Sequence, residues 1–150
     1  MPQYDPKSAE KVWNRVQSTA FPQGDAQTVL TLIAEEMQDA LAYNRLAKRL
    51  PPPQAAVARQ IAQQEQSHIS CLKGIYTLIT GRKAIVPPPA SSDDPPEIVL
   101  RRCYGREMRC LAQYEARMSD SQYGYIFRKL AQQEQEHCRH ILEILGTLAK

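Results

Sequence analysis

The chain has 150 residues, of which 43% are hydrophobic, and its 19 basic and 16 acidic residues leave a net charge of +3. This length and composition suit one domain with a single core that folds without disulfides or a partner chain. The small charge and the absence of long basic runs argue against nucleic-acid binding. Without a long apolar run or a start typical of a signal peptide, we expect a cytoplasmic protein that does not enter a membrane.

Residues 1–25 form a segment that precedes the main domain. Val12, Trp13 and Val16 recur in it at helical spacing, which predicts a short N-terminal helix beginning near Pro6 or Ser8. A single Trp beside two valines is typical of core packing, so we expect this helix to cover part of the domain at residues 26–150.

Prolines and glycines divide the remaining sequence into helical pieces. Four long helices are predicted over Ala26–Leu50, Gln54–Thr80, Glu97–Met118 and Gln122–Leu148. The Pro-rich linker at residues 82–96 can be neither a helix nor a central strand. The sequence therefore predicts an all-α four-helix bundle with a long crossover between the second and third helices, in which we expect the first and third helices to run parallel.

A carboxylate interrupts the apolar stripe of the first predicted helix and also that of the third. The first stripe contains Glu36 and the third contains Glu107. Tyr43 follows Glu36 by seven residues, and Tyr114 follows Glu107 at the same spacing. Both glutamates are therefore expected in the core of the bundle.

The second and fourth predicted helices carry nearly the same seven-residue stretch, Ala62–His68 and Ala131–His137. Each stretch contains a Glu-x-x-His pair, formed by Glu65 with His68 and by Glu134 with His137. Residues i and i+3 share one helix face, so a carboxylate and an imidazole at this spacing can reach the same ion.

These matches indicate an internal duplication of a helical hairpin, over residues 26–81 and 97–149. The duplication predicts a pseudo-twofold site with one ligand group from each helix. Four carboxylates in one core are unfavourable unless they are paired, protonated or bound to metal, and two divalent cations would balance their charge. Carboxylate oxygen and imidazole nitrogen suit iron or manganese, and zinc could use the same ligands.

The remaining candidate ligands are thiols and one histidine. The four cysteines form no Cys-x-x-Cys pair, so they are expected to be reduced thiols rather than ligands. Cys71 and His140 occupy equivalent positions of the repeat, three residues beyond the paired histidines, where we expect partly exposed side chains.

At these residues the chain resembles the ferritin-like superfamily, and within it the rubrerythrin-like branch, over about Ala26–Leu148. The resemblance implies that Glu36 and Glu107 are terminal ligands, that Glu65 and Glu134 bridge two metal ions, and that each ion receives one histidine, His68 or His137. It also implies that Tyr43 and Tyr114 hydrogen-bond to ligand carboxylates, although packing in the core would account for them equally well.

The function implied by this resemblance is a di-iron oxidoreductase that reduces peroxide or activates dioxygen. Rubrerythrins carry a further glutamate three residues after the third-helix ligand, where this chain has Cys110, and its counterpart in the first half is Asp39. Without a rubredoxin-like domain, electrons would come from a separate donor. The alternatives are iron sequestration with slow ferroxidase activity and a dimanganese catalase-like activity. We expect a homodimer, which would favour the enzyme over storage.

Overall fold

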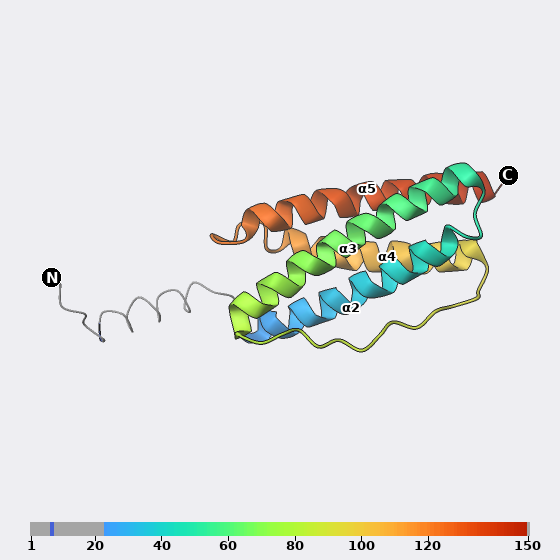
Figure 1. The fold of residues 1–150 in the computed structure, drawn as a ribbon. Helices are drawn as coiled ribbons and strands as arrows, with labels where there is room; N and C mark the ends of the chain where they lie inside the picture. Colours follow the sequence, from blue (N-terminus) through green and yellow to red (C-terminus); the bar gives the residue numbers. More distant parts are fainter. Residues whose placement is uncertain (1–6, 8–22, 150) are drawn as a thin grey trace.

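A computed structural model describes Lys7 and residues 23–149 (Figure 1). Among these residues the structure contains four α-helices and no strand: α2 (Gln23–Leu46), α3 (Pro52–Thr80), α4 (Pro96–Glu115) and α5 (Gly124–Leu148). The all-α class is thereby confirmed. The predicted short N-terminal helix lies outside the described residues.

The helix ends follow from proline and glycine. Prolines occupy the first turns of α3 and α4, where a missing N–H costs nothing. Gly81 ends α3 in the left-handed conformation (φ 69°), and its N–H binds the Thr77 carbonyl. Gly124 begins α5 so close to the preceding turn that a Cβ there would lie 2.5 Å from the carbonyl oxygen of Met118.

Two of the helices end earlier than the sequence predicts. The helix α2 ends at Leu46 rather than at Leu50, because the amides of Lys48 and Arg49 bind carbonyls three residues back and tighten the chain before Pro51. Similarly, α4 ends at Glu115, and turns over residues 116–123 lead into α5.

The helices form two hairpins, α2 with α3 and α4 with α5, which join through contacts of α2 with α4 and of α3 with α5 (Figure 1). Two apolar clusters fill the interior. One contains Ile33, Leu72 and Phe127, and the other contains Leu46 and Ile141. Along α3, α4 and α5 the buried glutamates lie between these two clusters, so the polar centre is enclosed by hydrophobic core at both ends.

The prediction that the first and third helices run parallel is wrong. Ion pairs join Asp39 to Arg106, Glu35 to Arg109 and Asp25 to Arg117, so positions that rise along α4 fall along α2. The antiparallel arrangement arises because the crossover, residues 81–95, runs the length of the bundle and begins α4 beside the end of α2 (Figure 1).

Contacts with α2 hold this crossover in place. The Gln38 side chain donates to the Ala90 carbonyl at 2.7 Å and accepts from the Ala90 amide at 3.3 Å. Arg45 pairs with Asp93 at 2.8 Å.

Within the described part of the chain, no helix combines the length and the apolarity needed to cross a membrane.

Candidate metal centre

Every helix of the bundle contributes a carboxylate to the middle of the core. The side chains concerned are at most 1% exposed: Glu36, Glu65, His68, Glu107, Glu134 and His137. These are the six residues that the sequence predicts as metal ligands, and the structure brings all of them together. Burying four carboxylates in one core costs several kcal/mol per charge unless something neutralises them.

The six side chains form two overlapping groups of four. The first group consists of Glu36, Glu65, His68 and Glu134, and the second of Glu65, Glu107, Glu134 and His137. In each group, one potential ligand atom from every residue lies within 4.8 Å of the others. Glu65 and Glu134 belong to both groups, so either carboxylate can face two neighbouring positions at once.

Distances within the two groups show the pseudo-twofold relation between the hairpins. His68 Nδ1 lies 2.9 Å from Glu134 Oε1 and 3.3 Å from Glu36 Oε2. His137 Nδ1 lies 2.8 Å from Glu65 Oε1 and 3.3 Å from Glu107 Oε2. Each imidazole therefore faces the outer glutamate of its own hairpin and the shared glutamate of the other. The two rings stack with their centroids 5.8 Å apart.

Two glutamines fix which nitrogen of each histidine faces the centre. His68 Nε2 lies 2.5 Å from Gln133 Oε1, and His137 Nε2 lies 2.6 Å from Gln64 Oε1. An amide oxygen only accepts, so each Nε2 carries the hydrogen and each Nδ1 turns its lone pair toward the carboxylates. A neutral imidazole with a free Nδ1 is the form that binds a metal ion. The sequence predictions did not include these glutamines, although each immediately precedes a shared glutamate.

Tyrosines hold the outer glutamates from the opposite hairpin. Tyr43 donates to Glu107 Oε1 at 2.9 Å, and Tyr114 donates to Glu36 Oε1 at 2.6 Å. The hydrogen bonds expected of the two tyrosines are therefore present. Burial, followed by the charge of the adjacent glutamate, raises both phenol pKa values well above 10.0, so each hydroxyl remains a donor.

Several of the atoms that face the centre have no hydrogen-bond partner among the described residues. They are Glu36 Oε2, both carboxylate oxygens of Glu65 and of Glu134, and His68 Nδ1. Although His68 Nδ1 is close to Glu134, the two atoms do not meet at hydrogen-bonding angles. Unpartnered lone pairs at this depth are rare in proteins and indicate a missing cation or proton.

The spacing of these atoms fits a metal ion. Two ligand atoms at about 2.1 Å from one ion, at octahedral or tetrahedral angles, are about 3.0 to 3.4 Å apart. The contacts of the two Nδ1 atoms, at 2.8 to 3.3 Å, approach that range. Without a cation, burial and then the charges of Glu36 and Glu107 raise the pKa of Glu134 well above 4.5. The donor set thus fits a metal ion better than it fits a structure held by hydrogen bonds alone.

A fifth buried carboxylate, Asp39, lies next to these groups but belongs to neither. It is fully buried, and its Oδ1 accepts a 2.5 Å hydrogen bond from Arg106 Nε while Oδ2 has no partner among the described residues. Burial, then the charge of Glu107, raises the Asp39 pKa well above its ordinary value. The sequence marks Asp39 only as the counterpart of Cys110; its partner Arg106 becomes visible only once α2 and α4 are known to be antiparallel.

The cysteines and the third histidine are not among the grouped ligands. Cys110 is buried, and desolvation raises its thiol pKa, which disfavours the thiolate that a metal requires. Cys71 is exposed and His140 is partly exposed, as expected.

Comparison with protein-family models, curated proteins and solved structures finds no match to this chain. Its function must therefore be argued from the centre itself.

Proposed function

We propose that this protein is a ferritin-like, rubrerythrin-like oxidoreductase that uses two metal ions to reduce peroxide or activate dioxygen. The observation that carries the proposal is the overlap of the two ligand groups through Glu65 and Glu134. In this proposal Glu65 and Glu134 would help to hold both ions. Glu36 and His68 would complete one position, and Glu107 and His137 would complete the other.

Charge and donor type support iron as the resident metal. The positive charge of two divalent cations balances the negative charge of the four glutamates, so it removes the repulsion between these carboxylates. A set of carboxylate oxygens with one imidazole nitrogen at each position is typical of iron and manganese. Zinc could occupy the same positions, but it has no redox chemistry.

The residues around the centre would prepare it for redox chemistry. When bound, iron would supply the electrons that reduce peroxide or dioxygen. Gln64 and Gln133 keep each imidazole turned with Nδ1 inward, while Tyr43 and Tyr114 hold a proton at the hydroxyl and orient the outer glutamates. The complete burial of the ligands excludes bulk water.

The electron balance requires a further component. Reducing hydrogen peroxide to two water molecules consumes two electrons and two protons. The proposal therefore includes a separate redox protein or small reductant that restores the reduced centre. Cys110 stands where rubrerythrins have another glutamate, so the two positions of the centre would have matching donor sets here, each with three glutamates and one histidine.

The proposal is tested by metal analysis of protein purified under native conditions, followed by anaerobic reduction and addition of peroxide with optical monitoring. We expect two redox-active ions per chain and stoichiometric reoxidation by peroxide. Fewer than two ions, or a reduced centre that peroxide leaves unchanged, would contradict it. A large cage-like assembly on a sizing column, with oxidised iron accumulating inside, would instead indicate storage.

A further inference from the structure

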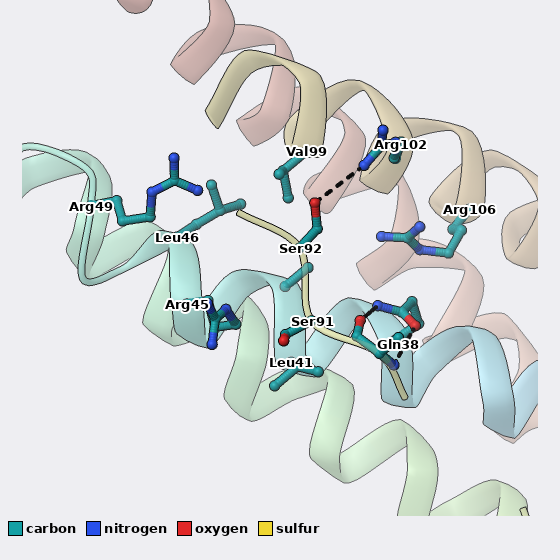
Figure 2. Close-up of a pocket in the computed structure, with 12 residues that line it drawn as sticks. Gln38, Leu41, Arg45, Leu46, Arg49, Ser91, Ser92, Val99, Arg102 and Arg106 are labelled. Atoms are coloured by element: carbon teal, nitrogen blue, oxygen red, sulfur yellow. Dashed lines mark hydrogen bonds between the residues drawn. The ribbon is translucent and has the colours of Figure 1, made fainter. Parts of the chain in front are cut away.

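A surface pocket lies between α2, α4 and the crossover, outside the metal centre. Its empty volume, with the open mouth included, is about 420 Å³. Part of its wall is apolar, from Leu41, Ala42, Leu46 and Val99. Four arginines complete it: Arg45 from α2, Arg49 from the turn after α2, and Arg102 and Arg106 from α4, with the crossover between the two pairs (Figure 2).

The ion pairs at the mouth of this pocket are exposed and exchangeable. Arg45 pairs with Asp93, whose side chain is 95% exposed. Arg102 pairs with Asp94 at 2.5 Å, and both side chains are about half exposed. Solvent screens such pairs, so they contribute little to stability. A carboxylate from a ligand can therefore replace Asp93 or Asp94 at a guanidinium with little loss.

The arginines also have donors that the protein leaves available. Arg45 Nε is buried and has no hydrogen-bond partner among the described residues. Arg49 donates to the main-chain carbonyl of Asp94 at 2.8 Å, and no ion pair of Arg49 with a carboxylate occurs in the described part of the chain. Four guanidiniums thus line the pocket, and three of them pair with a carboxylate, from Asp93, Asp94 or the buried Asp39.

We propose that this pocket binds a small organic carboxylate with a short aliphatic chain. A guanidinium matches a carboxylate with two parallel N–H donors, and the apolar wall formed by Leu41 and Val99 would accept the chain. The arginines repel cations, which excludes metal ions as the occupant. A mixture of apolar wall and a few convergent charged groups is typical of small-molecule sites.

Arg106 connects the pocket to the centre. It lines the pocket, and the same guanidinium pairs with buried Asp39, which is close enough to Glu107 and Glu36 to respond to their charges. A bound carboxylate and Asp39 would share this one cation, so the site would be coupled to the centre. The pocket itself is independent of the proposed metal chemistry, because its binding can be measured on metal-free protein.

The test is a titration of metal-free protein with butanoate, followed by the backbone and arginine Nε–H signals in NMR spectra. Butanoate should give saturable shifts centred on Arg45, Arg106 and the crossover, whereas the neutral analogue butanamide should not. In the Arg45→Gln/Arg49→Gln variant the affinity should fall about tenfold or more, because charge-assisted hydrogen bonds are lost.

The matched control is Arg59→Gln/Arg128→Gln, which removes the same charge from exposed positions outside the pocket. Its affinity should stay within about twofold of the unaltered protein. Arg102→Gln, also exposed, provides a second variant if the first does not fold. The proposal is overturned by the absence of saturable shifts or by equal losses in the pocket and control variants. The proposal is also overturned if inorganic phosphate binds and butanoate does not, because that result would show a site for inorganic anions.

Discussion

The two hairpins of this bundle are alike where they supply the centre and different one turn away from it. Each provides an outer glutamate, a shared glutamate, a histidine and a tyrosine, and their contacts correspond closely across the pseudo-twofold relation. Asp39 in α2 and Cys110 in α4 occupy equivalent positions, yet one is a buried carboxyl group and the other a buried thiol. The two hairpins therefore share the grouped side chains and differ in what surrounds them.

The difference separates the grouped side chains from their surroundings. All six grouped side chains have a counterpart in the other hairpin. The Asp39–Arg106 pair has no counterpart, and the pocket lies on its side of the bundle. The asymmetry therefore lies outside the six side chains that could hold a metal.

The largest effect is expected from removing a shared carboxylate. Glu65→Ala or Glu134→Ala should weaken the binding of both ions by more than about a hundredfold, and by similar amounts, because each residue belongs to both groups. Metal stoichiometry after gel filtration measures this. Glu136→Ala, a change at a partly exposed residue of α5, is the control. Two tightly held ions per chain in either variant would contradict the assignment.

The next largest effect is the loss of stability when one of two ion pairs between α2 and α4 is broken. Arg106→Met leaves the buried Asp39 carboxyl group without its partner and should lower the free energy of unfolding by about 3 kcal/mol. Arg109→Met breaks the more exposed pair with Glu35 and should cost at most about 1 kcal/mol. Urea unfolding of the metal-free variants measures both values.

A second substitution sharpens this comparison. Adding Asp39→Cys to Arg106→Met places in the first hairpin the residue type that the second carries at Cys110. Most of the lost stability should return, because the unpaired carboxylate is gone. If Arg106→Met and Arg109→Met lower the free energy of unfolding equally, the burial of Asp39 does not require its ion pair with Arg106.

A smaller, symmetric effect is expected at the glutamines that bind the histidines. Gln64→Ala and Gln133→Ala should each weaken metal binding by about tenfold, because the imidazole loses the acceptor that turns Nδ1 inward. The exposed neighbours provide the controls Gln63→Ala and Gln132→Ala. Competition with a coloured zinc chelator measures the affinities. Identical affinities in all four variants would mean that the glutamines do not position the ligands.

The last effect is the pH dependence of the metal-free protein. The folded-state pKa of Glu134 is raised, so the folded chain keeps a proton that the unfolded chain releases near 4.5. Stability should therefore fall as pH rises above that value, by at most about 1.4 kcal/mol per pH unit for this group. Urea unfolding at about pH 5 and about pH 7 measures the slope.

The matched variants for this measurement replace a carboxyl with an amide. Glu134→Gln should flatten the slope, while Glu136→Gln, at a partly exposed position, should leave it unchanged. The pKa of Asp39 is also raised, and this residue would account for the part of the slope that remains in Glu134→Gln. Stability that rises with pH in the unaltered metal-free protein would contradict the shift at Glu134.

The sequence predicted most of the fold because its signals are local. Prolines and glycines act on their own turn, so the four helices and the long crossover follow from Pro52, Gly81 and Pro96. The predicted ends of α2 and α4 are less accurate, because tight turns after Leu46 and Glu115 replace the last part of each predicted helix. Whether α4 runs parallel to α2 depends on where the crossover lies, and no single turn of sequence determines that.

The sequence indicates the six candidate ligands and the tyrosines beside them because their spacing recurs in its two halves. Helical spacing alone places Glu65 and His68 on one face. Tertiary structure decided what spacing cannot express: that each histidine faces the shared glutamate of the other hairpin, that Gln64 and Gln133 set its tautomer, and that Arg106 neutralises Asp39. These contacts join residues more than sixty positions apart. They exist only because two antiparallel hairpins pack at one register, which is a property of the assembled bundle.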